Sequence, residues 1–374
     1  MQGLDGLLVL PGAFRSLQRA ELSGPSFHRL RVTEVMPLTD EAVAVTFDVP
    51  PELASDFAFR AGQHVTVRAE VDGADVRRSY SICSNANDGK LRIGVKRLPG
   101  GAFSTWATSQ LRAGIELEVM PPVGEFVVDP EPRHYGAVTA GSGITPVLSL
   151  VSTTLESEPG CRWTVIFGNR SADQVMFLDE LEGLKDRYPD RLHLVHVLSR
   201  EQGVMPLFTG RIDESKMNEL LDRVVSPSAP SEWFLCGPFE MVAAARAVLE
   251  GRGLMPDLIH DELFFAGPLD LTSLPPEPSE QPGTVELSVI LDGRSTTTRM
   301  LPETSVLDAA LRVRGELPFS CKGGMCASCK ARVIEGEVRM EKNWALVDYE
   351  LAQGFVLTCQ SHPTSDRLIV DYDV

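Results

Sequence analysis

The feature that most constrains this 374-residue chain is a set of cysteines near its end. Three of them stand in CKGGMCASCKA with the spacing C-x4-C-x2-C, and a fourth follows in FVLTCQSHP. This 3+1 spacing is typical of [2Fe–2S] clusters, and the glycines of the loop allow backbone amides to approach the sulfur atoms. The predicted cluster ligands are Cys321, Cys326, Cys329 and Cys359.

Structural zinc is the alternative occupant of four thiolates. Zinc sites usually place their ligands in two short C-x2-C pairs, which this chain lacks. The other three cysteines, Cys83, Cys161 and Cys236, are scattered, and we expect them to be small buried side chains. The total of seven cysteines is odd, and no basic segment precedes the short apolar patch at the N-terminus. Neither a disulfide framework nor a cleaved export signal is therefore indicated, and we expect a cytoplasmic protein.

Composition and charge exclude some classes of function. The chain is 43% hydrophobic and 23% charged, which is ordinary for a globular protein. No apolar run reaches the about 20 residues that span a bilayer. The net charge of −17 disfavours nucleic-acid binding, which needs clustered Lys and Arg, and suits a protein partner with a basic docking surface. We therefore expect neither nucleic acid nor a membrane among the partners.

Changes in the hydrophobic pattern predict three domains. Short alternating strands with turn signals over residues 26–131 predict an antiparallel β-barrel. Residues 132–266 alternate apolar strands with helices, which indicates an α/β domain with a parallel sheet. The Pro- and Ser-rich stretch 267–283 is predicted to be an extended linker. Residues 284–374 hold a hairpin and a capped helix, which predict a compact α+β domain, and residues 1–25 form a leader.

Two neighbouring motifs of the barrel segment predict a site for a large anionic ligand. In RSYSICS, strand alternation places Arg78 and Tyr80 on one face and Ser79 and Ser81 on the other. A cation, an aromatic ring and hydroxyls in this arrangement can neutralise, stack on and hydrogen-bond to one ligand. In GVKRLPGGAFS, residues 101–104 are predicted to start a helix whose free amides suit a pyrophosphate.

A glycine turn and two strand ends of the α/β segment predict a nucleotide site. AGSGITP lies between a strand and a helix, where Gly141 and Gly143 allow a pyrophosphate to approach the backbone. Two later strands end in FGNRS and VLSRE, and ligands of open α/β sheets bind at such carboxyl ends. Arg170, Ser199 and Arg200 are predicted to bind an extra phosphate there, which indicates NADPH, with NADH the less favoured donor. The alternative is that both arginines are solvated surface residues.

From about residue 26 to the end, these motifs together resemble the ferredoxin–NADP reductase superfamily fused to a plant-type ferredoxin. The resemblance implies a FAD-binding barrel, an NAD(P)-binding α/β domain and a β-grasp [2Fe–2S] domain. It also implies that Ser81, Thr145 and Glu262 lie at the place of hydride transfer. The cofactor-binding residues that it implies are Arg78, Ser79, Tyr80, Ser81, Gly94, Val95, Lys96, Gly101, Ala102, Phe103, Ser104, Gly141, Gly143, Ile144, Thr145, Arg170, Ser199, Arg200, Cys236, Gly237, Pro238 and Phe264.

The resemblance extends to a narrower group of proteins. FHRLRVTEV, IGVKR, IHDELF, NWAL and VLTCQ are similar to segments of the reductases that serve ring-epoxidising monooxygenases of phenylacetyl-CoA. This similarity implies an electron path from NADPH through FAD and [2Fe–2S] to a diiron oxygenase partner. A flavin must stand in the middle, because nicotinamide delivers a hydride whereas the cluster accepts one electron. The alternatives are a reductase for another oxygenase, with a steroid, aromatic or quaternary-amine substrate, and a non-catalytic redox sensor.

Overall fold

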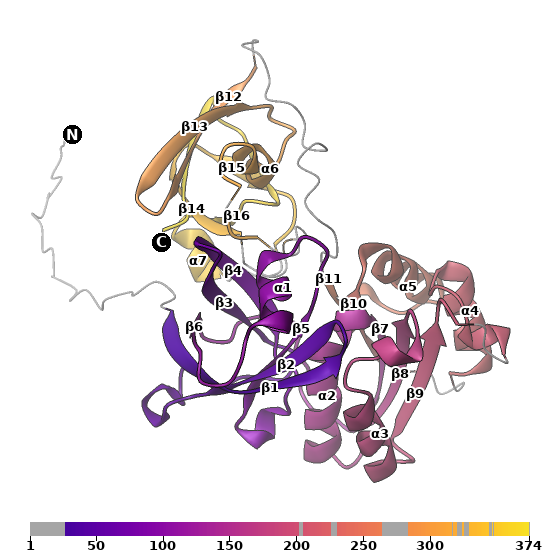
Figure 1. The fold of residues 1–374 in the computed structure, drawn as a ribbon. Helices are drawn as coiled ribbons and strands as arrows, with labels where there is room; N and C mark the ends of the chain where they lie inside the picture. Colours follow the sequence, from indigo (N-terminus) through magenta and orange to yellow (C-terminus); the bar gives the residue numbers. More distant parts are fainter. Residues whose placement is uncertain are drawn as a thin grey trace, which may run out of the picture.

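The computed structural model describes residues 27–201, 205–225, 230–263, 283–315, 317–319, 324, 329–343, 346 and 348–373. Figure 1 shows three bodies along the chain: a barrel in indigo and violet, an α/β domain in magenta, and a smaller domain in orange and yellow. The predicted leader and nearly all of the predicted linker lie outside the described residues.

The first body is the predicted antiparallel barrel. Its six-stranded sheet has the order β4-β3-β6-β1-β2-β5, and a bridge between Ile82 and Ile93 joins the two ends of the sheet. Alternate apolar side chains fill one core, into which α1 also packs Phe103 and Ala107. The elements are β1 (His28–Thr39), β2 (Ala42–Asp48), β3 (His64–Val71), β4 (Ala74–Ser81), β5 (Leu91–Lys96), α1 (Ala102–Ser109) and β6 (Glu116–Val119).

The second body is the predicted α/β domain, with a parallel sheet in the order β11-β10-β7-β8-β9. Helices α2 and α3 cover one face and α4 and α5 the other, each pair over its own apolar cluster. Burial on both faces explains why the strands are nearly continuous apolar runs. The elements are β7 (His134–Ala140), α2 (Ile144–Ser157), β8 (Arg162–Asn169), α3 (Leu178–Arg187), β9 (Leu192–Leu198), α4 (Glu214–Arg223), β10 (Glu232–Gly237), α5 (Phe239–Gly251) and β11 (Ile259–Leu263).

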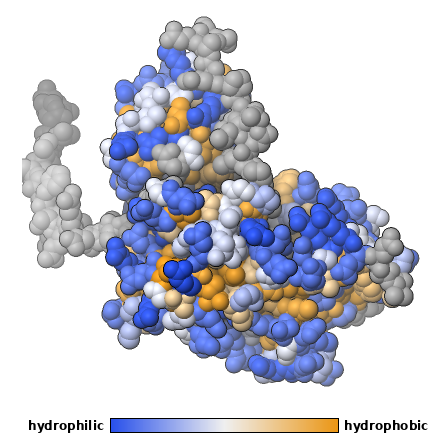
Figure 2. All heavy atoms as spheres, in the orientation of Figure 1, coloured by the Kyte–Doolittle hydropathy of each residue, from blue (hydrophilic) through white to orange (hydrophobic). Residues whose placement is uncertain are grey.

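The barrel and the α/β domain share a hydrophobic core. The apolar cluster around α2 includes Cys83 of the barrel. Ser149 Oγ of α2 donates a buried hydrogen bond to the Ser84 carbonyl at 2.7 Å. Arg92 of β5 makes two contacts with the Glu180 carboxylate of α3, at 2.9 and 2.5 Å. Figure 2 shows hydrophobic residues gathered on the face of the molecule where β1, β2 and α2 lie. The shared apolar cluster and these polar contacts make the two domains one packed unit.

The third body has a core of its own, formed within residues 285–372. Its mixed sheet has the order β13-β12-β18-β14-β16, in which β12 is antiparallel to β13 and parallel to β18. This sheet packs against α6, whose first turn is capped by Ser305 Oγ accepting from the Asp308 N–H at 3.1 Å. The elements are β12 (Val285–Leu291), β13 (Arg294–Met300), α6 (Val306–Leu311), β14 (Lys330–Glu335), β15 (Val338–Met340), α7 (Asp348–Ala352), β16 (Phe355–Leu357), β17 (Ser361–Pro363) and β18 (Arg367–Asp371).

Two further predictions concern the three scattered cysteines and the presence of membrane-spanning helices. Cys83, Cys161 and Cys236 are free and buried, as predicted. Among the helices of the described residues, none combines the length and apolarity needed to cross a membrane.

Candidate cofactor sites

The end of β4 carries the aromatic residue and the hydroxyls of the predicted flavin motif. Ser81 is its last residue and pairs with His64 of β3. The ring centroid of Tyr80 lies 5.4 Å from that of Phe103 in α1, so the two predicted flavin motifs meet in space. Burial raises the pKa of the Tyr80 hydroxyl, and the charge of Arg78 opposes that shift. The ring is therefore neutral at physiological pH and suited to stacking on a flavin.

The start of α1 requires its glycine. Ser104 Oγ accepts a hydrogen bond from the Leu98 N–H at 3.1 Å and donates one to the Gly101 carbonyl at 3.3 Å. A Cβ on Gly101 would lie only 2.5 Å from Ser104 Oγ. Helix α1 begins at Ala102, and first-turn N–H groups have no acceptor within a helix. The predicted segment 101–104 thus forms a turn that suits a phosphate group.

Gly94 of β5 marks a close contact between the two domains. A Cβ there would lie 2.6 Å from Thr145 Cγ2 and 3.1 Å from the ring of Phe177. Thr145 is fully buried in the first turn of α2, where its Oγ1 donates to the Ser142 carbonyl at 2.9 Å. Phe177 has a φ of 58°, which is unusual for a residue with a side chain. The barrel strand and the nucleotide-side helix therefore meet at two residues that the resemblance had placed in one site.

The turn η3 (Gly141–Gly143) between β7 and α2 uses both of its glycines. Gly141 has a φ of 55°, in the left-handed region. A Cβ on Gly143 would lie 2.2 Å from the Cys236 carbonyl. This close approach packs the start of α2 against the end of β10, which Gly237 terminates just before Pro238. The predicted nucleotide residues thus share the carboxyl edge of the sheet.

Positive charge gathers beside that turn. Lys96 Nζ lies 3.7 Å from the position of a Cβ on Gly141. Burial lowers the pKa of Lys96, Glu41 opposes this shift, and Arg170 lowers the pKa further. The Arg200 N–H donates to the Arg170 carbonyl at 2.8 Å, so the two exposed arginines leave neighbouring strands together. A bound anion would relieve the repulsion among these cations. The remaining predicted residues lie on the same elements: Val95 in β5, Ile144 at the start of α2, and Ser199 directly after β9.

A buried pair that the sequence did not predict joins the two domains. His64 Nδ1 of β3 lies 3.8 Å from Glu262 Oε1 of β11, and the two side chains are 4% and 9% exposed. His64 is opposite Ser81, and Glu262 is opposite Cys236. Burial, and then the charge of Glu262, raise the pKa of the Cys236 thiol well above its usual range. Three predicted residues therefore converge through a histidine that no sequence motif had marked as functional.

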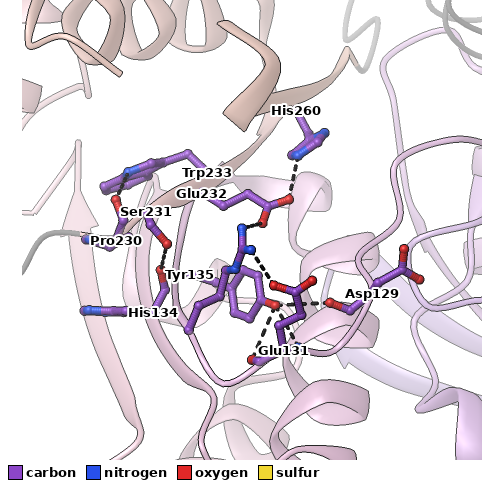
Figure 3. Close-up of polar contacts among 10 residues, drawn as sticks. Asp129, Glu131, His134, Tyr135, Pro230, Ser231, Glu232, Trp233 and His260 are labelled. Atoms are coloured by element: carbon purple, nitrogen blue, oxygen red, sulfur yellow. Dashed lines mark hydrogen bonds and ion pairs between the residues drawn. The ribbon is translucent and has the colours of Figure 1, made fainter. Parts of the chain in front are cut away.

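A second network fixes the strand that carries Glu262. His260 Nε2 lies 2.8 Å from Glu232 Oε1, and its ring stacks on that of Phe234 with centroids 4.7 Å apart. Arg133 Nη1 donates to Glu232 Oε2 at 3.0 Å (Figure 3). The His260 hydrogen bond lowers the pKa of Glu232, against the opposing effect of burial, and Arg133 lowers it further. The network ties β10 to β11 and to the chain that enters β7.

Two of the four predicted cluster ligands lie within the described residues. Cys329 and Cys359 are 2% and 7% exposed. Thr358, the residue before Cys359, donates from its Oγ1 to the Cys329 carbonyl at 2.9 Å and from its N–H at 3.2 Å, which holds the two cysteine-bearing segments side by side. Gly324 has a φ of 81°, and a Cβ on it would lie 2.9 Å from the Lys342 carbonyl. The described part thus fits a cluster held under a tight loop. Cys321, Cys326 and Phe264 lie outside the described residues.

Comparisons with known proteins agree with this arrangement. Three family models match: the oxidoreductase FAD-binding domain at residues 29–128, the oxidoreductase NAD-binding domain at 138–247, and the 2Fe-2S iron-sulfur cluster binding domain at 289–364. A subunit of the 1,2-phenylacetyl-CoA epoxidase of Escherichia coli K12 is 40% identical over 93% of this chain and 98% of its own length. The 3-ketosteroid-9-alpha-monooxygenase ferredoxin reductase component of Mycolicibacterium smegmatis is 34% identical over 92% and 96%. The chain belongs to the family of oxygenase reductase components.

The fold of this reductase component is shared with solved structures. Phthalate dioxygenase reductase matches with a TM-score of 0.57 at 22% identity, covering 92% of this chain and 98% of that one. The predicted barrel, parallel sheet and ferredoxin-type domain are thereby confirmed as one architecture.

The reductase component is an NAD(P)H-dependent flavin iron–sulfur oxidoreductase. The predicted FAD, [2Fe–2S] cluster and pyridine nucleotide are confirmed by the matching families. When bound, the flavin supplies the conversion between a two-electron hydride and single electrons. The residues predicted to hold the flavin and the pyridine nucleotide are the ring of Tyr80, which lies beside Phe103, and the glycine turns at Gly101 and Gly141–Gly143, while Thr145 is buried where the two domains meet.

Proposed function

We propose that this reductase component carries electrons from NADPH through FAD and the cluster to a diiron oxygenase that epoxidises the ring of phenylacetyl-CoA. The observation that carries the proposal is the 40% identity to the Escherichia coli epoxidase component over nearly the whole of both chains. The proposal includes a cytoplasmic location, which the buried free thiols of Cys83, Cys161 and Cys236 support, because a reducing compartment keeps thiols unpaired.

Reconstitution with candidate oxygenases tests the choice of partner. The FAD- and cluster-loaded protein is mixed with a purified diiron oxygenase for phenylacetyl-CoA, and oxygen uptake and epoxide formation are measured. The proposal predicts turnover that requires NADPH, the oxygenase and phenylacetyl-CoA together. Turnover without substrate, or none at all from a protein that still reduces cytochrome c with NADPH, contradicts it.

A steroid or quaternary-amine oxygenase is the second candidate partner. Reductases for 3-ketosteroid 9α-monooxygenase and for glycine betaine monooxygenase of Chromohalobacter salexigens are 34% and 32% identical to this chain. The same assay with those oxygenases and their substrates separates the candidates. Faster coupled turnover with either one than with the phenylacetyl-CoA enzyme would transfer the proposal to it.

The preference for NADPH is the second part of the proposal. It is supported by the exposed cations Arg170 and Arg200, which are neighbours at the ends of β8 and β9. Ser199 lies directly before Arg200 and donates its N–H to the last residue of β8. We expect kcat/KM for NADPH to exceed that for NADH by about tenfold or more, since charge-assisted hydrogen bonds to a phosphate contribute at least that much. Arg200→Gln is expected to remove most of the preference by slowing the NADPH reaction, whereas the exposed Arg112→Gln leaves it unchanged. Equal kcat/KM values in the wild type would contradict this part alone.

A further inference from the structure

Asn169 is a buried polar residue whose side chain the fold does not use. It is the last residue of β8, it is only 7% exposed, and neither atom of its side-chain amide has a hydrogen-bond partner within the described residues. A buried amide without a partner destabilises a folded chain, so native proteins retain one where water or a ligand completes it. The buried position of the Asn169 amide therefore indicates a hydrogen-bond partner from outside the chain, such as a ligand.

Asn169 lies between the glycine turn and the predicted phosphate-binding residues. On one side, Gly168 pairs with Ala140, the residue that precedes the turn η3. On the other side, the Ser199 N–H donates to the Asn169 carbonyl at 2.9 Å. Side chains alternate along a strand, so Asn169 is on the same face of β8 as Phe167, which packs in the core cluster with α2. The amide thus stands on the face of the sheet from which α2 begins.

The surroundings favour an anionic ligand that also carries hydroxyl groups. Arg170 follows Asn169 directly, and Lys96 Nζ lies 3.7 Å from the Cβ position of Gly141 in the turn. The amide end of α2 adds a partial positive charge. A neutral amide among these cations offers donors and an acceptor together, which suits a phosphate attached to a ribose. The pyridine nucleotide of this family contains such a unit at its pyrophosphate.

We propose that Asn169 is a nucleotide-recognition residue whose amide hydrogen-bonds the pyrophosphate on the adenosine side of the dinucleotide. The adenosine side follows from the contact with Ser199, at the strand end predicted to hold the 2′-phosphate. The inference rests on the family's use of a pyridine nucleotide and is independent of which oxygenase is served.

Calorimetric titration with two matched ligands tests the assignment. 2′,5′-ADP carries the 5′-phosphate of the proposed contact, whereas adenosine 2′-monophosphate lacks it. In the FAD-loaded protein, Asn169→Leu is expected to weaken binding of 2′,5′-ADP and NADP⁺ by about tenfold or more and that of adenosine 2′-monophosphate by less than about twofold. Because leucine is similar in size and leaves no unpaired amide, the melting temperature of the ligand-free variant is expected to be unchanged or higher.

Further variants separate recognition from structure. Asn169→Ala is expected to show the same ligand pattern if the leucine variant does not load FAD. Asn218→Ala, at an exposed asparagine of α4, should leave both affinities unchanged. Unchanged binding of 2′,5′-ADP by Asn169→Leu, an equal loss for both ligands, or a lowered melting temperature with normal binding would overturn the proposal.

The test also distinguishes this inference from the proposed NADPH preference. If the wild type binds ADP-ribose but neither 2′-phosphorylated ligand, the preference is wrong. Asn169 is then tested with ADP-ribose against adenosine, and a loss confined to ADP-ribose would still support the inference. An equal effect of Asn169→Leu on both of these ligands would overturn it.

Discussion

At the scale of single residues, Gly94 shows how little space separates the two domains at the predicted site of hydride transfer. Its Cα stands where any side chain would meet both Thr145 and the Phe177 ring. Only a residue without a Cβ allows the end of β5 to approach the first turn of α2 so closely. The absent side chain thus sets the distance between the flavin-side strand and the nucleotide-side helix.

Replacing Gly94 by alanine is expected to push the domains apart. The new methyl would lie 2.6 Å from Thr145 Cγ2, and overpacking of this kind costs about 1–3 kcal/mol. We expect a lower free energy of unfolding in urea and a flavin reduction rate that falls by about tenfold or more, because small displacements at a reacting site are costly. Gly183→Ala is the control, since no atom would meet its Cβ in α3 and alanine favours helix. Equal rates of flavin reduction in wild type and Gly94→Ala would contradict this account of the junction.

At the scale of elements, β11 is held in place by polar contacts as well as by its sheet partner. His260 and Glu262 are two residues apart on this strand, so they share one face. One contacts Glu232 at the start of β10, and the other contacts His64 of the barrel. The strand therefore connects the parallel sheet to the barrel near the predicted hydride-transfer residues.

The Glu232 network predicts a stability difference that depends on pH. The pKa of Glu232 is lower in the folded chain than its ordinary value of 4.5. Its charge therefore stabilises the fold at all pH values above about 4.5, and this contribution is lost as pH falls through the folded-state pKa. Glu232→Gln is expected to lower the free energy of unfolding by about 1–2 kcal/mol at pH 7, with the difference shrinking in acid. Urea unfolding of the wild type and Glu232→Gln at pH 7 and at a pH below 4.5 checks this, with the exposed Glu34→Gln as control. An equal difference in unfolding free energy at the two pH values would contradict the prediction.

The patterns that the sequence could predict were those with a local physical cause. Alternating residues predicted the strands of the barrel, apolar runs predicted the buried parallel strands, and the spacing of cysteines predicted the cluster family. Contacts between distant segments had no such signal. Nothing in GQHVTV indicates that His64 contacts Glu262, and nothing in FGNRS indicates that the Asn169 amide is buried without a partner in the described residues. Polar residues reveal a role of this kind only when burial and partners are known.

At the scale of the whole molecule, the ferredoxin-type domain has a core separate from the other two domains. Flavin reduction and electron exit should therefore be separable by one substitution. Cys359→Ser removes a predicted cluster ligand, and Cys359 belongs to the core of the ferredoxin-type domain rather than to the apolar clusters of the barrel and the α/β domain. We expect NADPH-dependent reduction of ferricyanide, which accepts electrons from flavin directly, to change by less than about twofold. Reduction of cytochrome c is expected to fall about 100-fold, because the cluster is the exit. A parallel loss of both activities would contradict the proposed order of carriers.

The measurement that tests the central claim most directly is an anaerobic titration of the purified protein with NADPH and, separately, with NADH, followed by visible absorbance. The account predicts that NADPH bleaches both the flavin and the cluster bands, and at much lower concentration than NADH does. Bleaching of the flavin with a cluster that stays oxidised, or a protein with no cluster band despite its four predicted cysteine ligands, would contradict the electron path proposed for this chain.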